Sequence, residues 1–277
     1  MALFLIRYGE IALKSAPVRR KMEKILMHNI RTAFAKEKTP CSIKKSFGRI
    51  FLETHQPQKA KKVLKRVFGI VSFSPCFSCT SGMEEIKALA LKRARTKKFT
   101  TFAIKTHRLG VHDFTSQDIN IQVGDVIRTT LKKRVDLTHP QKTFFIEIRD
   151  KITYLYTEKI PCLGGMPLGS TGIIVTLLES REDLLAAWLF MRRGCVILPV
   201  TDKKSFVKTL EKWSFREIES YKKTELEKIL ERYPFGIVTA DQKKIKKLKK
   251  QLSLPVFNPL LGMEEKEVKR MLKAIRK

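Results

Sequence analysis

The sequence is short of acidic residues and of cysteine, and it contains no long apolar segment. No run of about 18 uncharged apolar residues occurs, so we expect no transmembrane helix. The first ten residues, MALFLIRYGE, lack the basic start and the cleavage site of a secretory signal, and we therefore expect a cytoplasmic protein. A hydrophobic fraction of 43% excludes a mostly disordered chain. The length of 277 residues allows one large core or a few small ones.

The shortage of acidic residues leaves a large positive charge. Twenty-seven Asp and Glu face 57 Lys and Arg, which gives a net charge of +30. Thermophilic surfaces that are rich in lysine balance it with glutamate, so an excess of this size predicts a polyanionic partner. Nucleic acid is favoured over a membrane surface, because no strongly amphipathic basic helix with aromatic anchors is present.

Five cysteines, an odd number in a chain expected inside the cell, argue against a disulfide framework. Cys76-x-x-Cys79 has the spacing of a redox or zinc pair, but no second pair or nearby histidine completes a site. Cys195 is interpreted as a small buried hydrophobic residue. We predict no metal site and no catalytic residue among them.

Residues 1–75 are predicted to follow the β-α-β-β-α-β order of a ferredoxin-like module. Apolar residues at helical spacing predict the first helix and place its apolar face on one side. A hairpin is expected across Ser46-Phe47-Gly48. The expected elements are a strand Leu3–Arg7, a helix from Pro17 to about Glu37, strands Cys41–Lys45 and Arg49–Glu53, a helix Pro57–Val67 and a strand Ile70–Phe73.

Residues 76–160 form the next predicted unit. A helix over Met83–Lys98 precedes a strand over Thr101–Thr106. Thr115-Ser-Gln-Asp118 is a capping-box pattern that starts a second helix. Strands Phe144–Arg149 and Lys151–Tyr156 form a hairpin at Asp150.

A glycine-rich linker, residues 161–172, leads into a strand–helix alternation over 173–277 that is typical of a doubly wound parallel sheet. Lysine fills six of the eight positions 243–250, which we interpret as a solvated helix face, with phosphate contact as the second interpretation. The expected strands are Ile173–Leu178, Val196–Val200, Phe235–Val238 and Pro255–Val256, and the expected helices are 181–193, 203–212, 216–232, 240–250 and 264–276.

Motifs spread over nearly the whole chain resemble those of the tRNA 4-thiouridine synthetase family, and they occur in the same order as in that family. The resemblance implies an α/β protein in which 1–75 is a ferredoxin-like domain, 76–160 a THUMP domain and 173–277 a PP-loop domain. The motifs are Arg7-Tyr-Gly-Glu-Ile-Ala-Leu-Lys14, the THUMP-like pattern between Phe102 and Pro140, Glu158-Lys-Ile-Pro161 with Gly164-Gly-Met-Pro-Leu-Gly169, Met191-Arg-Arg-Gly194, and Leu254–Met263.

The family implies tRNA binding, chiefly at the acceptor end, by the THUMP and ferredoxin-like domains. Folded RNA is recognised largely through phosphates, 2′-hydroxyls and shape, and basic residues crowd the THUMP-like segment. The residues predicted to bind RNA are Lys92, Arg93, Arg95, Lys97, Lys98, Lys105, His107, Arg108, Lys132, Lys133 and Arg134.

The family's catalysis implies an SGGxDS-type loop that holds the pyrophosphate of ATP, between a strand and a helix N-terminus. The resemblance places Leu178, Glu179, Ser180, Arg181, Glu182 and Asp183 at that loop. No glycine pair remains to bring backbone N–H groups close to phosphate. Ser180-x-x-Asp183 is itself a capping-box pattern, so we expect the N–H groups at the helix start to have acceptors within the protein. One carboxylate about 5 Å from a phosphate charge costs roughly 3 kcal/mol at an effective dielectric of about 20, which weakens binding about a hundredfold. We therefore expect a degenerate nucleotide loop and no cofactor.

Two further departures point the same way. A Thr-Gly-Glu triplet of the family reads Thr239-Ala240-Asp241, and the sequence ends at Lys277, before the part expected to carry the family's catalytic cysteine. The hypothesis is a tRNA-binding protein whose adenylation site is lost, acting alone or presenting tRNA to a separate tRNA-modifying enzyme; a homodimer is left open. The alternatives are a functional tRNA sulfurtransferase that acts with a partner, and a non-specific nucleic-acid binder.

Overall fold

The computed structural model describes residues 1–46, 48–233 and 235–276. Phe47, in the predicted hairpin turn, lies outside the described residues. By its internal contacts the chain divides into two compact units. The first unit comprises Met1–Ile6, Lys44–His55 and Ser72–Ile160, and the second comprises Arg7–Ile43, Gln56–Val71 and Pro161–Lys277. The predicted domain boundaries at residues 75, 160 and 172 were drawn from sequence motifs and not from contacts, so they stay a prediction.

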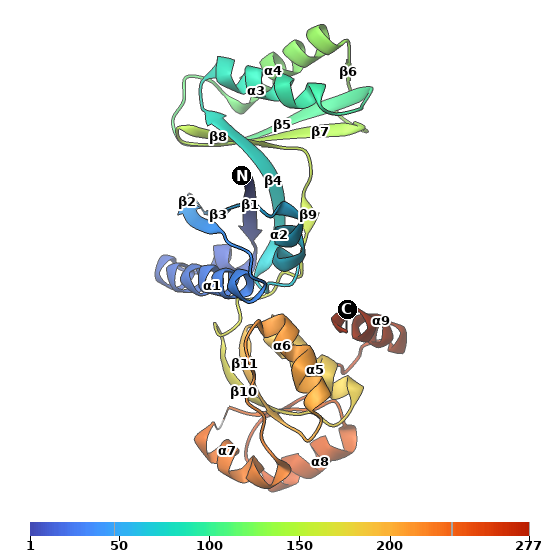
Figure 1. Ribbon diagram of the computed structural model, residues 1–277. Coiled ribbons are helices and arrows are strands. Elements are labelled where there is room, and N and C mark those ends of the chain that lie inside the picture. Colours follow the sequence, from blue (N-terminus) through green and yellow to red (C-terminus); the bar gives the residue numbers. More distant parts are fainter. Residues whose placement is uncertain (47, 234, 277) are drawn as a thin grey trace. The chain divides into compact units, whose positions relative to one another are not determined.

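Most of the first unit is built on a mixed sheet with the order β2-β3-β1-β4-β8-β7-β5-β6, in which β9 pairs with β4 (Figure 1). The strands β7 and β8 form the predicted hairpin, with Asp150 in a left-handed conformation at φ 54°. The strands are β1 (Ala2–Tyr8), β2 (Ser42–Ser46), β3 (Arg49–Thr54), β4 (Ile70–Thr80), β5 (Thr101–Leu109), β6 (Arg134–Val135), β7 (Lys142–Arg149), β8 (Ile152–Tyr156) and β9 (Ile160–Pro161).

Two helices, α3 (Met83–Arg95) and α4 (Ser116–Leu131), cover one face of β5 and β7 (Figure 1). Their inward residues pack on Phe102 and Phe144 of those strands. The predicted capping box at the start of α4 is confirmed: the Asp118 N–H donates to Thr115 Oγ1 at 3.1 Å, and Thr115 N–H donates to Asp118 Oδ2 at 2.7 Å. This cap satisfies N–H groups that have no partner inside the helix, so α4 begins where the sequence predicts.

The second unit contains a four-stranded parallel sheet with the order β11-β10-β12-β13. Helices α5, α6 and α9 pack on one face, around Trp188 and Leu210, and α7 and α8 pack on the other, around Ile229. The predicted α/β class and doubly wound pattern are thus confirmed. The elements are β10 (Gly172–Leu177), α5 (Arg181–Arg192), β11 (Cys195–Val200), α6 (Lys204–Ser214), η2 (Lys223–Glu225), α7 (Leu226–Arg232), β12 (Ile237–Val238), α8 (Gln242–Gln251), β13 (Val256–Phe257) and α9 (Glu265–Ile275).

The second unit also holds η1 (Glu10–Leu13), α1 (Ala16–Lys36) and α2 (Pro57–Leu64), which complete the predicted β-α-β-β-α-β order of the N-terminal region. The ring of Phe68, which follows α2, meets the ring of Trp188 edge-on at 5.5 Å. In the described ranges, no helix is both long and apolar enough to cross a membrane.

One predicted helix, 216–232, is wrong over its first half. Phe215 adopts a left-handed conformation at φ 56° and ends α6. Residues 216–220 belong to no helix or strand. Tyr221 N–H then donates to the Pro199 carbonyl at 2.9 Å, and the Tyr221 carbonyl accepts from Thr201 N–H at 2.9 Å. Pairing with the end of β11 therefore overrides the local helical pattern, and helix resumes only at Lys223.

Candidate functional site

The first unit has a strongly basic end, where the last turn of α3 and the last turn of α4 come together. β6 pairs in parallel with the start of β5, and Arg134 N–H donates to the Thr100 carbonyl at 3.1 Å. This pairing places two predicted clusters beside the start of β5. We call this group the basic end; its exposed members are Lys92, Arg95, Lys97, Lys98, Lys132 and Arg134.

Two other predicted residues near the basic end are partly engaged in packing. The guanidinium carbon of Arg93 lies 3.8 Å from the ring centroid of Phe77. The Lys133 ammonium lies 5.6 Å from the ring centroid of Phe99. Such cation–π contacts hold the cations against the fold, so these two residues are less free than their neighbours to contact a partner.

The predicted trio Lys105, His107 and Arg108 does not form one cluster. Alternate residues of a strand point to opposite faces, and Ile104 faces α3 and α4. Lys105 and His107 are exposed on the face away from those helices. Arg108 lies on the helix side, with its NH1 nitrogen 3.4 Å from the Gly110 carbonyl oxygen. Only the first two could contact one partner surface together.

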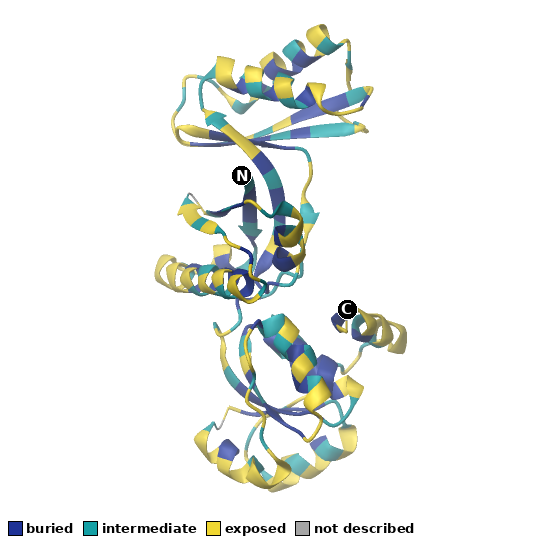
Figure 2. Cartoon of the chain, in the orientation of Figure 1, coloured by how far each residue is buried: buried dark blue, intermediate teal, exposed yellow. Residues whose placement is uncertain are grey.

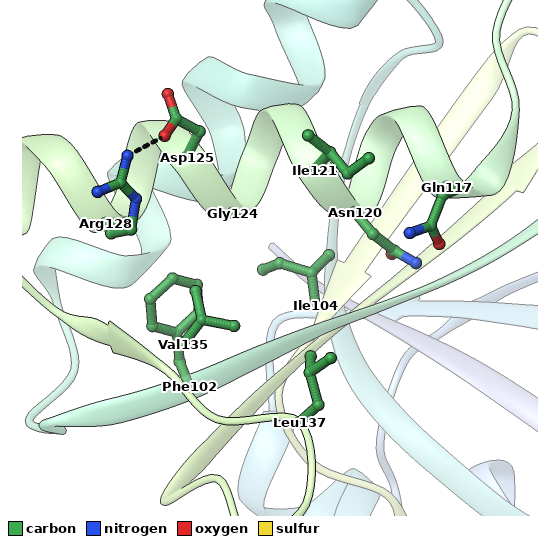
Figure 3. Close-up of a pocket in the computed structure, with 10 residues that line it drawn as sticks. All are labelled: Phe102, Ile104, Gln117, Asn120, Ile121, Gly124, Asp125, Arg128, Val135 and Leu137. Atoms are coloured by element: carbon green, nitrogen blue, oxygen red, sulfur yellow. Dashed lines mark hydrogen bonds and ion pairs between the residues drawn. The ribbon is translucent and has the colours of Figure 1, made fainter.

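A hollow of about 350 Å³ lies between α4, β5 and the segment that follows β6 (Figure 3). Ile121 and Leu137, on either side of it, are 59% and 72% exposed. Asn120 Oδ1 accepts from Thr106 N–H at 3.1 Å. The lining residues are Phe102, Ile104, Gln117, Asn120, Ile121, Gly124, Asp125, Arg128, Val135 and Leu137.

None of these lining residues was predicted from the sequence to belong to a site. Arg128, on the rim, forms an ion pair with Asp125 at 2.6 Å (Figure 3). The hollow therefore offers apolar side chains and amides, with its guanidinium already paired. The sequence signal that could have indicated the hollow is the presence of apolar Ile121, Val135 and Leu137 among polar neighbours. The structure shows all three to be exposed.

The cysteines do not form a site among the described residues. Cys76 packs with Leu5 and Tyr154 on one face of the sheet, and Cys79 packs on the other face, against the α3–α4 core. The two sulfur atoms of the Cys-x-x-Cys pair thus face away from each other. Burial raises the pKa of Cys79 to about 11 and of Cys162 to about 12, so both thiols stay protonated at neutral pH. Cys195, predicted to be buried, is half-buried.

In the second unit, the turn after β10 is closed by the carboxylate of Asp183, which is 1% exposed. Its Oδ2 accepts from Glu179 N–H at 3.1 Å and from Ser180 N–H and Oγ–H at 2.9 Å each. Its Oδ1 accepts from Thr239 Oγ–H and Ala240 N–H, both at 2.8 Å. The predicted Ser180–Asp183 capping box is confirmed. Donors from two strand ends therefore converge on a carboxylate of the protein itself.

Glu179 interacts with three neighbouring lysines. Its carboxylate forms ion pairs with Lys244 and, at 2.9 Å, with Lys223. Lys203 donates to its backbone carbonyl. The hydrogen bond from Lys244, and then that from Lys223, lowers the pKa of Glu179. Arg181 and Glu182 are exposed at the start of α5, and Leu178 is fully buried.

Comparison with known proteins gives the same domain types. The ThiI ferredoxin-like domain family matches residues 3–74, and the THUMP domain family matches residues 81–158. A "Probable tRNA sulfurtransferase" of Methanocaldococcus jannaschii is 30% identical, over 98% of this chain and 87% of its own length. The chain belongs to the ThiI-like tRNA sulfurtransferase family, as the sequence motifs predicted.

Coverage of other relatives is partial. The "Probable tRNA sulfurtransferase" of Methanosarcina acetivorans is 39% identical over 205 residues, which is 71% of this chain. The chain spans about half the length of that curated relative (50%) and of the one from Methanothermobacter thermautotrophicus (52%).

Two solved structures have the same fold. The crystal structure of PH1313 from Pyrococcus horikoshii Ot3 is 30% identical, with a TM-score of 0.84 over 99% of both chains. A 4-thiouridine synthetase–RNA complex with bound ATP is 21% identical, with a TM-score of 0.81 over 99% of this chain and 85% of the other.

Proposed function

We propose that this protein binds tRNA, at the acceptor end, through its THUMP and ferredoxin-like domains. The observation that carries the proposal is the basic end, where exposed cations from α3, α4 and β6 gather. Phosphate contacts dominate the affinity of proteins for nucleic acid, and this surface offers several cations to one stretch of backbone. The 4-thiouridine synthetase of the same fold was solved with RNA bound, which adds support.

The hollow beside the basic end supports the same function. Single-stranded RNA ends are bound by packing of unstacked bases and by hydrogen bonds to their edges. Ile121, Val135 and Leu137 offer apolar contact, and the Gln117 amide offers hydrogen bonds. An unpaired nucleotide next to the duplex phosphates would suit such a surface.

We further propose that the turn after β10 does not hold ATP. A phosphate there would have to displace Asp183 from five donors, and would meet Glu179 beside it. Buried carboxylates bound by several donors are costly to strip of them. The residues present therefore fit a structural connection between β10, β12 and α5 better than a pyrophosphate-binding site.

The second candidate is tRNA thiolation carried out with a partner that supplies the ATP-dependent step. The curated relatives favour this candidate over a free tRNA-binding factor, since they are named as probable tRNA sulfurtransferases. In this candidate the chain presents tRNA, and the turn after β10 keeps its structural role.

The tRNA proposal is tested by replacing Lys97, Lys98, Lys132 and Arg134 together with glutamine. We expect at least tenfold weaker binding of a full-length tRNA transcript, measured by fluorescence anisotropy, because four phosphate contacts are lost. The matched control replaces Lys266, Lys269, Arg270 and Lys273 of α9 and should bind within about threefold of the wild type. Equal affinity of the two variants would sink the proposal.

The ATP proposal is tested by calorimetric titration of the purified chain with Mg-ATP, alone and with tRNA. We expect no heat of binding at millimolar nucleotide. Saturable binding that Glu182→Ala leaves unchanged and Thr239→Val abolishes would restore an ATP site at the turn.

A further inference from the structure

The outward face of α8 carries a second positive surface, on the unit that does not hold the basic end. Leu248 packs into the core formed with Val175 and Ile229, and Ile245 is 8% exposed. These two apolar residues fix which side of the helix faces inward. Figure 2 shows the remaining positions of α8 as mostly exposed. The exposed lysines are Lys243, Lys246, Lys247, Lys249 and Lys250.

The charge of this face is not balanced. The sequence from 242 to 263 contains no Asp or Glu. Lys244 forms ion pairs with Glu179 and Asp241, whereas no ion pair joins the other five lysines of α8 to any residue that the structure describes.

Helix α9 shows what a solvated basic helix looks like in the same unit. Lys269 forms an ion pair with Glu265 at 2.5 Å, and Arg270 with Glu267 at 3.7 Å. Such pairs stabilise exposed helices. Its cations are thus interspersed with carboxylates, which those of α8 are not.

The arrangement on α8 has an internal cost. Lysines three and four residues apart repel one another on a helix surface. Lys243 also lies in the first turn, where the helix dipole disfavours a cation. A partner that brings negative charge would relieve both effects, so the face is suited to a polyanion.

We propose that the outward face of α8 binds the phosphodiester backbone of RNA, as a contact surface additional to the basic end. The inference rests on the proposed tRNA binding and extends it to the second unit. From Lys243 to Lys250 the helix rises roughly 10 Å, and a nucleic-acid duplex carries about one phosphate charge per 1.7 Å of its axis. Several lysines therefore meet phosphates at once. A membrane fits less well, since interfacial helices bind through an exposed apolar face and that of α8 is turned inward.

The test replaces Lys243, Lys246, Lys247 and Lys250 with glutamine. Glutamine keeps the helix propensity and removes the repulsion, so circular dichroism and thermal melting should show an intact fold. The control is the α9 variant described above, which removes the same number of charges. Binding of a full-length tRNA transcript is measured between 50 and about 400 mM salt.

We expect the α8 variant to flatten the log–log salt dependence by about 2, at roughly 0.9 for each of two lost phosphate contacts. Its affinity near physiological salt should fall tenfold or more. Affinity and slope equal to those of the α9 control would overturn the inference and leave the proposed function standing. Unchanged binding by the basic-end variant would instead remove the proposed function itself. Loss of binding to phosphatidylglycerol vesicles, with tRNA binding unchanged, would overturn the inference in favour of a membrane.

Discussion

Among single residues, Asp183 links three elements of the second unit through its carboxylate. Its two oxygens accept five hydrogen bonds from Glu179, Ser180, Thr239 and Ala240, which joins the ends of β10 and β12 to the start of α5. The sequence predicted the capping box from the Ser-x-x-Asp spacing alone. It could not predict the bonds to residues 239 and 240, which depend on the pairing of β10 with β12.

The change Asp183→Asn tests this structural role. The amide nitrogen must face backbone or hydroxyl donors in either orientation, so we expect a loss of about 2–4 kcal/mol in the free energy of unfolding. Both tryptophans of the chain, Trp188 and Trp213, lie in the second unit, and their fluorescence during urea unfolding reports on it. The control Glu182→Gln, at an exposed position, should change the value by less than about 0.5 kcal/mol. An unchanged free energy of unfolding in the Asp183→Asn variant would contradict the structural role.

At the scale of elements, prediction succeeded where the signal is local. The cap at Thr115, the hairpin at Asp150 and the order of strands and helices all follow from short-range patterns. It failed where pairing decides. The two-residue strands β6 and β9 have no period to detect, and residues 216–222 are not helical because Tyr221 pairs with the end of β11.

The same limit applies to the candidate RNA site. The clusters at 92–98 and 132–134 were found from charge, and β6 brings them together. Arg108 was grouped with Lys105 from sequence proximity, whereas the alternation of β5 turns it to the helix side. The hollow was missed because its residues come from three elements. The RNA-binding role of all these residues stays a prediction.

The linker before β10 has two adjacent glycines, Gly164 and Gly165, that differ in the space available for a side chain. Both have positive φ, 65° at Gly164 and 76° at Gly165. A Cβ at Gly165 would lie 2.2 Å from the Arg192 carbonyl oxygen, whereas one at Gly164 would meet nothing nearer than 3.8 Å. Gly165 is therefore required by the close backbone contact as well as by its conformation, and Gly164 by its conformation alone.

Alanine at each glycine separates the two effects. Gly164→Ala should cost about 1–2 kcal/mol through left-handed strain alone. Gly165→Ala should cost roughly 3 kcal/mol or more, since overpacking adds to the strain. Urea unfolding followed by tryptophan fluorescence measures both. Equal losses would show that the contact with Arg192 has no energetic weight.

At the scale of the whole molecule, a net charge of +30 dominates the behaviour. Charge alone would attract any polyanion, so affinity for RNA by itself does not distinguish a tRNA-binding protein from a non-specific one. The cations of the basic end, however, lie on or close to α3, α4 and β6 of the THUMP domain, beside a hollow suited to an unpaired nucleotide. We therefore predict a preference for tRNA over other polyanions.

Competition between tRNA and duplex DNA measures this preference. A labelled tRNA transcript bound to the wild-type chain is displaced with unlabelled tRNA or with duplex DNA of equal phosphate concentration. We predict that tRNA competes at least tenfold better, with a log–log salt slope of about −4 to −5 for six phosphate contacts. Duplex DNA that competes as well as tRNA, or a slope near zero, would show that the protein does not recognise tRNA through these contacts.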